Sequence, residues 1–155
     1  MRTGHGEIDS RMRDFRRAFG RSGARVTQQR IEIFKEVART EEHPDAVTVH
    51  KRVRKRLPTI SLDTVYRTLW MLMDMGLIST LGVYRERVRF DGNTDAHHHF
   101  ICTRCGMARD LYSGDLSKLR APEEVKRLGS VDTSHVEFRG VCSECLKAGR
   151  RKSGK

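Results

Sequence analysis

The four cysteines of the chain occur as two Cys-x-x-Cys pairs, Cys102 with Cys105 and Cys142 with Cys145. Soft thiolates at this spacing close a tetrahedral shell around zinc, which has no redox activity of its own. The 36 residues between the pairs exceed the about 15–20 of a simple zinc ribbon. The intervening segment must therefore fold back and bring the pairs together, and we expect a structural zinc site.

Two disulfides are the alternative use of four cysteines. Disulfides are uncommon in the cytosol, and the first residues, Met1 to Glu7, lack the apolar core of a secretory signal. No apolar run is long enough to span a membrane. We therefore expect a cytoplasmic protein without a membrane partner, and we favour the metal site.

Histidines and aspartates lie on both sides of the first cysteine pair. In a strand, His97 and His99 share one face while His98 points away. The first two can therefore meet one ion, together with Asp91 and Asp110. A solvated histidine loop would be the alternative if these acids did not flank the run. A mixed nitrogen and oxygen set suits iron, manganese or zinc and leaves a coordination position open.

Positive charge is concentrated in the first half of the chain and at its very end. The formal net charge is +11, and residues 1–92 hold 19 Lys/Arg against 12 Asp/Glu. Residues 93–146 hold 7 against 8, and the last nine residues add five Lys/Arg. This distribution favours a polyanionic partner for the first half, with nucleic acid as the leading candidate.

The first half reads as four helices followed by two strands. Apolar periodicity and capping residues predict a first helix over residues 9–19, ended by Gly20 and Gly23, and a second that begins at Thr27. A third is predicted from Asp45 to Pro58 and a fourth from Ser61 to Gly76. The predicted buried residues are Ile31, Phe34 and Ala38 in the second helix, Ala46, Val49, Val53 and Leu57 in the third, and Val65, Leu69, Leu72 and Met73 in the fourth.

The fourth helix and the two strands after it form a recognisable pattern. Residues 77–81 and 83–90 alternate like strands, and Gly82 is the predicted turn. Helices that end in such a hairpin are typical of a winged helix-turn-helix, whose recognition helix enters the major groove. The buried stripe of the fourth helix turns Tyr66, Arg67 and Trp70 toward another surface. The alternative is that these are only exposed residues of a core helix.

The second half predicts a small α+β unit. Residues 99–102 and 133–139 alternate like strands, and residues 116–128 contain helical material broken at Pro122. Such a unit has too little core to be stable alone, so a metal and a subunit interface are both expected to stabilise it. The expected division is a DNA-binding domain over 1–92, a metal-binding domain over 93–147 and a basic disordered tail over 148–155.

With these elements in place, the chain resembles the ferric uptake regulator family of metal-dependent repressors over residues 10–147. The resemblance rests on the order of elements, the run Thr-Val-Tyr-Arg-Thr-Leu at 64–69, the run His-His-His-Phe-Ile-Cys at 97–102, and the two cysteine pairs. It implies an α+β fold, with an N-terminal winged helix-turn-helix followed by a small α/β dimerisation domain that has a structural zinc site. It further implies a homodimer that binds a palindromic operator in double-stranded DNA when metal is loaded.

The resemblance also assigns residues to sites. It implies structural zinc at Cys102, Cys105, Cys142 and Cys145, and it adds His43 to Asp91, His97, His99 and Asp110 as ligands of a regulatory metal. One ion held by all five would fix the two domains relative to each other. The DNA-binding residues implied are Ser61, Thr64, Tyr66 and Arg67. His98 and His135 match a further metal site of some relatives, although its acidic partner is not evident near Ser117.

Within the family, the resemblance is greatest to the peroxide-responsive repressors. These have aspartate at the positions of Asp91 and Asp110, and their residues matching His43 and His97 are oxidised by peroxide. Fe(II) or Mn(II) is then the expected regulatory ion. An iron-uptake regulator is the main alternative, because the recognition-helix sequence is common there too. A zinc-responsive regulator fits less well, since no cysteine remains beyond the quartet.

Parts of the sequence also fit two other classes of function. Two histidines and a carboxylate also describe non-haem iron oxygenases, but such an enzyme needs an enclosed pocket, so we expect no enzyme. The second class is a zinc-stapled adaptor, a binding protein whose zinc is only structural. It would hold one zinc per chain and no second ion.

Overall fold

A computed structural model describes residues 5–84 and 87–152 of the chain. The chain divides into two compact units, Met1–Thr94 and Asp95–Lys155, which we call the N-terminal unit and the C-terminal unit. The division lies two residues after the boundary expected from the sequence. None of the helices in these described ranges has both the length and the apolar character needed to cross a membrane.

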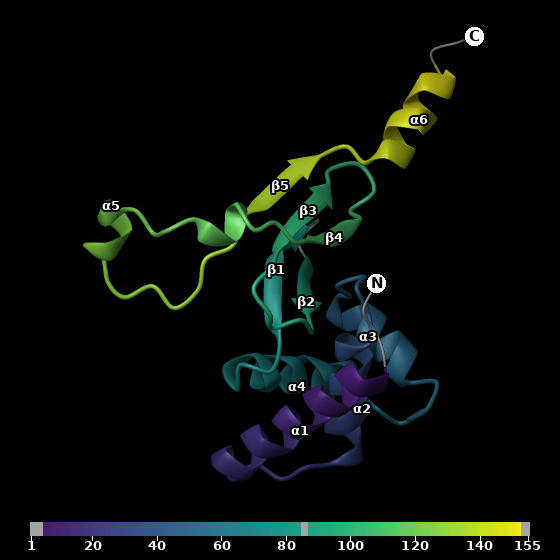
Figure 1. Cartoon of the computed structure of the whole chain (residues 1–155). Helices are drawn as coiled ribbons and strands as arrows, with labels where there is room; N and C mark the ends of the chain where they lie inside the picture. Colours follow the sequence, from purple (N-terminus) through teal and green to yellow (C-terminus); the bar gives the residue numbers. More distant parts are fainter. Residues whose placement is uncertain (1–4, 85–86, 153–155) are drawn as a thin grey trace. The chain divides into compact units, whose positions relative to one another are not determined.

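The described part of the N-terminal unit consists of helices followed by a hairpin (Figure 1). In chain order the elements are α1 (His5–Ser22), α2 (Gln28–Ala38), α3 (Ala46–Val53), α4 (Leu62–Asp74), β1 (Ser79–Tyr84) and β2 (Arg87–Asp91). This is the order of a winged helix-turn-helix, as the sequence predicted.

Three of these helices begin at the capping residues that the sequence predicted. The side chains of Thr27, Asp45 and Ser61 each accept a hydrogen bond from the backbone N–H three residues further on. An N-cap of this kind satisfies one of the donors that the first turn of a helix leaves without an intrahelical partner. These starts therefore follow from local chemistry.

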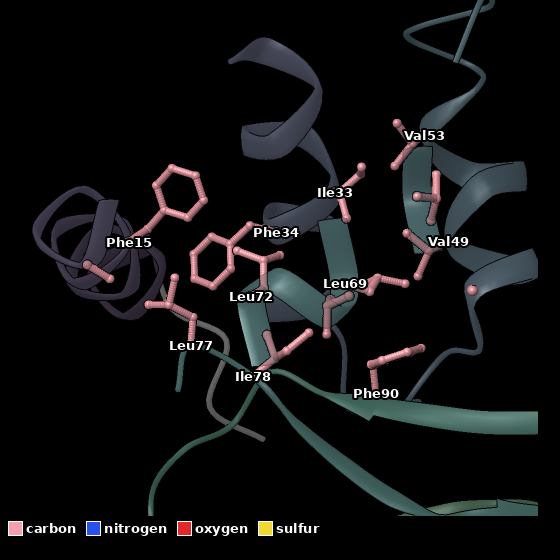
Figure 2. Packing of buried hydrophobic residues seen from close by; sticks show 14 of the residues in the cluster. Phe15, Ile33, Phe34, Val49, Val53, Leu69, Leu72, Leu77, Ile78 and Phe90 are labelled. Carbon is pink, nitrogen blue, oxygen red and sulfur yellow. The ribbon is translucent and has the colours of Figure 1, made fainter. Parts of the chain in front are cut away.

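The apolar stripes of the four helices meet in one core, and Phe34, Leu69 and Leu72 are among the side chains that pack together there (Figure 2). The predicted stripe of α2 needs correction. Ile33 and Val37 are fully buried there beside Phe34, whereas Ile31 and Ala38 are only partly buried. Both readings have helical spacing, and packing against α3 and α4 decides between them.

Two predicted helix ends were also wrong. Helix α1 runs through Gly20 and ends at Ser22, where Gly23 follows with a φ of +69°. A left-handed residue is the usual terminator of a helix, so Gly23 ends it and Gly20 does not. Helix α3 ends at Val53 and continues only as hydrogen-bonded turns before Pro58.

The hairpin differs from the prediction in its turn. Strand β1 extends through Gly82 to Tyr84, and the strands connect through residues 85 and 86, which lie outside the described residues. The antiparallel register shifts between Leu81 and Tyr84. Gly82 therefore lies at an irregularity inside a strand, a common place for glycine.

A three-stranded sheet organises the C-terminal unit. Strand β3 (His98–Cys102) lies in its middle, antiparallel to β4 (Ala108–Leu111) and parallel to β5 (Glu137–Gly140). The sequence predicted strands at both ends of this unit.

The helical pieces of the C-terminal unit are short. They are the 3₁₀ turn η1 (Leu116–Lys118), α5 (Glu123–Lys126) and α6 (Ser143–Lys152). The first two replace the longer helical stretch expected on either side of Pro122. Helix α6 passes through residue 148 to Lys152, so residues 148–152 are helical where the sequence predicted disorder, and the rest of the predicted tail lies outside the described residues.

Candidate metal centres and DNA-binding surface

The four cysteines converge in the C-terminal unit. Cys102 ends β3, Cys105 lies in the turn after it, and Cys142 and Cys145 lie at the start of α6. Their sulfur atoms all lie within 4.8 Å of one another, and those of Cys105 and Cys142 are 3.8 Å apart. A tetrahedron with metal–sulfur bonds of about 2.3 Å has edges of about 3.8 Å. The sulfur positions fit a tetrahedral ion and are too far apart for a disulfide.

Backbone geometry positions these thiols. Gly106 adopts a φ of +75° and donates to the carbonyl of Cys102 at 2.9 Å, which closes the turn between the first two cysteines. The backbone N–H of Thr103 donates to the carbonyl of Gly140 at 2.7 Å and ties this turn to the end of β5. The two Cys-x-x-Cys loops are thereby held against each other.

The thiols differ in acidity. Backbone N–H groups of Cys105 and Cys142 stabilise the thiolate of Cys102 and lower its pKa to about 6. Hydrogen bonds with the thiols of Cys142 and Cys105 raise the pKa of Cys145 to about 12. Zinc binds the deprotonated form of cysteine, so a bound Zn²⁺ would stabilise all four thiolates.

A second group of donors lies at the other end of β3. The Nε2 atoms of His97 and His99 are 2.8 Å apart, and Asp110 Oδ1 lies 3.6 Å from the first and 3.7 Å from the second. Asp110 comes from β4, where it lies directly across from His99. The predicted alternation in β3 is confirmed, since His97 and His99 meet on one side.

The protonation of His97 suits a ligand. Its Nδ1–H donates to the carbonyl of Asp95 at 2.7 Å, because a carbonyl oxygen can only accept. In the neutral imidazole this leaves a lone pair on Nε2, the atom that faces His99 and Asp110. A hydrogen bond to the remote ring nitrogen is the usual support of a metal-binding histidine.

His98 points elsewhere. Its Nδ1 accepts from the backbone N–H of Val136 at 3.1 Å, and its Nε2 lies 3.3 Å from the hydroxyl of Ser117. It thereby connects β3 to the segment before β5 and to η1. The ring of His135 lies 6.0 Å from that of His99. A further metal at His98 and His135 stays a prediction, and the hydrogen bonds give His98 a structural role in its own right.

The N-terminal unit contributes two more of the predicted ligands. His43 lies in the loop between α2 and α3, and Asp91 ends β2. Their nearest polar atoms, Nε2 and Oδ1, are 3.7 Å apart. His43 has a φ of +52°, an uncommon conformation for any residue other than glycine, which indicates that the surrounding structure imposes it.

An arginine of the hairpin holds the loop of His43 in place. Arg89 of β2 donates to the carbonyls of His43 and Glu42 at 2.8 and 2.9 Å. The backbone N–H of Phe90 donates to the carbonyl of Pro44 at 3.0 Å. The loop of His43 is thus fastened to the strand that ends in Asp91. Sequence reasoning missed Arg89, because its partners lie 46 and 47 residues away and leave no local pattern.

Both predicted ligand sets therefore have a chemistry that fits a metal. The thiol cluster is soft and closed, as in structural zinc sites. The other set offers imidazole nitrogens and carboxylate oxygens, His97, His99 and Asp110 in one unit and His43 and Asp91 in the other. Such donors suit Fe(II), Mn(II) or Zn(II).

The predicted recognition helix presents an exposed face. Tyr66 and Trp70 of α4 are each 40% exposed, and Arg67 is exposed and pairs with Asp63 at 2.9 Å. An ion pair this exposed contributes little to stability and can be exchanged for contacts with DNA. Ser61 and Thr64 lie at the N-terminal end of α4, where their hydroxyls are 2.8 Å apart. This end attracts anions such as phosphate.

Comparisons with known proteins agree on one family. A family model described as the ferric uptake regulator family matches residues 21–139. The peroxide-responsive repressor PerR of Staphylococcus epidermidis is 29% identical over 144 residues, which cover 92% of this chain and 95% of that protein.

Solved structures give the same picture. The peroxide stress regulator of Campylobacter jejuni is 26% identical, with a TM-score of 0.66 over 86% of this chain and 98% of that one. The ferric uptake regulator Fur of Helicobacter pylori has a TM-score of 0.74 over 94% and 97% of the two chains, and at 22% identity it supports the fold alone.

Proposed function

This chain belongs to the ferric uptake regulator family, and from that membership we propose that it is a metal-dependent transcriptional repressor that releases DNA in response to peroxide. Zinc would be structural, and Fe(II) or Mn(II) regulatory. The protein would act in the cytoplasm as a homodimer on a palindromic operator, and not as an enzyme.

The observation that supports this proposal best is the arrangement of His97, His99 and Asp110. Three donor atoms, from β3, β4 and the residue just before β3, face one another within 3.7 Å. The tautomer of His97 directs a lone pair toward the same point. An ordinary core histidine needs only a hydrogen-bond partner, whereas this group offers converging ligands.

His43 and Asp91 would complete the ligand set from the N-terminal unit. Because they belong to the unit with the recognition helix, an ion that binds all five residues would favour one arrangement of the two units over others. DNA affinity would then depend on occupancy of the ion. Because Arg89 fastens the His43 loop to β2, a displacement of His43 or Asp91 would move the hairpin as well.

Peroxide sensing follows from the choice of ion and ligands. When bound, Fe(II) would supply the redox chemistry that activates peroxide at this site. Overall, peroxide and a ring C–H of His43 or His97 would give a ring C–OH and one water, so the O–O bond breaks and the ring carbon supplies the two electrons. An oxidised ring is an altered ligand, so the ion would be held less tightly and would no longer couple the two units.

The decisive experiment measures DNA binding with Fe(II), Mn(II) and Zn(II) separately, each before and after peroxide. We expect the iron form to release DNA and to gain the mass of one oxygen atom on the peptide of His43 or His97. The manganese form should bind DNA and resist peroxide.

An iron-uptake regulator is the second candidate, because the sequence Tyr66-Arg67-Thr68-Leu69 on α4 is common in that branch too. It would account for an iron form that stays on DNA after peroxide with both peptides unmodified. A protein that binds no DNA with any of the three ions would exclude both candidates and leave the zinc-stapled adaptor.

A further inference from the structure

Arg11 of α1 joins three segments of the N-terminal unit. Its guanidinium donates to the carbonyl of Leu77 at 2.8 Å, to the carbonyl of Gly92 and to the hydroxyl of Thr94. Leu77 follows the end of α4, while Gly92 comes directly after the predicted ligand Asp91 and Thr94 two residues later. One side chain therefore connects the first helix, the end of the recognition helix and the segment that leaves β2.

The anchor of this side chain is rigid. Helix α1 packs on the core through Phe15 and Phe19, which are 0% and 1% exposed. The planar guanidinium holds several donors in fixed directions, so it can bind three acceptors at once. The three acceptors lie 66 to 83 residues away from Arg11 in the chain, which is why no sequence pattern indicates the cluster.

A second contact, with the end of α2, holds the same segment. A Cβ at Gly92 would lie only 2.7 Å from the Cα of Ala38, at the end of α2. Only glycine allows this approach without a shift of backbone. Next to it, the N–H of Asn93 donates to the carboxylate of Asp91 at 2.8 Å. The backbone on the C-terminal side of Asp91 is thus held between α1 and α2.

We propose that Arg11 is a positioning residue for the regulatory metal: by holding Gly92 and Thr94, it sets the backbone from which Asp91 presents its carboxylate beside His43. This inference rests on the proposed function, because it takes Asp91 as a ligand. It adds a role for α1, which supplies no ligand itself. Loss of Arg11 frees the segment after Asp91, so the ion must then order it at a cost in affinity.

The test measures the affinity of the zinc-loaded protein for Mn(II), which does not react with peroxide. Arg11→Ala should weaken Mn(II) binding about tenfold, the lower end of the losses seen when a group that supports a ligand is removed. Thr94→Val removes one of the three acceptors and should have a smaller effect in the same direction. Arg13→Ala, an exposed arginine on the same helix, loses the same charge and should bind Mn(II) like the wild type.

A double substitution separates positioning from a general structural role. In an Asp91→Ala background, Arg11→Ala should cause no further loss of Mn(II) affinity, since the residue it positions is absent. An equal loss in both backgrounds would overturn the inference, and so would wild-type affinity in the single variant. If Arg11→Ala does not fold, Thr94→Val decides the question in the same two backgrounds.

The result that would contradict the proposed function differs from the one that would contradict the role of Arg11. A wild-type protein that binds no Mn(II) beyond its zinc would remove the regulatory site and this inference with it. Normal Mn(II) binding by the wild type and by all Arg11 and Thr94 variants would overturn only the role of Arg11.

Discussion

The two units of this chain are stabilised by different means. The N-terminal unit buries a continuous cluster of aromatic and aliphatic side chains from four helices and the hairpin. In the C-terminal unit, the buried apolar side chains that the structure describes include Ile101 and Ala108 beside two cysteines, while Leu119, Leu128 and Phe138 are exposed. The first unit can rely on hydrophobic burial, and we expect the second to depend on bound zinc and on a partner subunit.

Removal of the structural metal should produce the largest difference in stability between the two units. Cys102→Ser opens the closed ligand shell, and structural zinc in small domains contributes about 10–16 kcal/mol. We expect loss of zinc, of the dimer and of hydrogen-exchange protection in the C-terminal unit, with protection retained around Phe34 and Leu69. Native and hydrogen-exchange mass spectrometry measure these together.

Ser143→Ala, next to Cys142 but exposed, is the matched control and should keep its zinc. A wild-type protein that remains a stable dimer without zinc would contradict this account of the C-terminal unit.

A cavity in the N-terminal core should give the reverse pattern. Phe34→Ala removes a ring that is 1% exposed at the centre of the cluster, and such truncations cost about 3–5 kcal/mol. We expect the N-terminal unit to unfold at a lower urea concentration than in the wild type, while the zinc content stays at the wild-type value. The control is Val26→Ala, since Val26 is 43% exposed. Simultaneous loss of zinc would mean that the units do not unfold independently.

A surface substitution tests whether the N-terminal unit can lose function without losing stability. Arg67→Ala should weaken binding to the specific operator by about 1–3 kcal/mol if Arg67 reads a guanine edge. Its thermal unfolding should match the wild type, because the side chain is exposed and pairs only weakly with Asp63. Binding isotherms on operator and random DNA decide the matter. Equal losses on both would make Arg67 a phosphate contact.

The smallest effect concerns the cap of α3. Burial raises the pKa of Asp45, but hydrogen bonds from Thr48 and Arg87 outweigh it and lower that pKa below its ordinary value of 3.8. A lowered pKa stabilises the fold above pH 3.8, and this contribution is lost as pH falls further through the folded-state pKa. Asp45→Ala should cost about 0.5–2 kcal/mol at neutral pH.

Asp45→Asn provides the comparison, since asparagine also caps helices but cannot pair ionically with Arg87. It should keep most of the stability at neutral pH and lose the dependence on pH below 3.8. Denaturant unfolding at several pH values measures both, and an Asn variant as unstable as the Ala variant would assign the effect to the ion pair.

The sequence predicted what depends on neighbours along the chain. Caps at Thr27, Asp45 and Ser61 and the alternation of His97 with His99 follow from local geometry, and all are present. The position of Gly82 was misjudged, because a glycine between two alternating runs suits a turn and a strand irregularity equally. The prediction of the buried face of α2 was only partly right, because Ile33 and Val37 are buried by packing against helices that are distant in sequence.

The contacts of the arginines could not be predicted at all. Arg89 and Arg11 hold backbone carbonyls, and every segment of the chain offers carbonyls. Only the folded arrangement reveals that the ones they hold flank His43 and Asp91. The ligands of a site can thus be identified from residue types, while the groups that orient those ligands require the structure.

Strand β3 connects the two predicted metal sites, and this bears on the order in which they are filled. It begins beside the histidines and ends at Cys102, and its pairing of His99 with Glu137 and of Cys102 with Gly140 is set in one register. A slip of one residue would turn His97 and His99 to the opposite face. Zinc at the four cysteines would hold that register, so we expect zinc to be bound before the regulatory ion. A newly made chain without zinc is then expected to respond poorly to peroxide even where iron is plentiful.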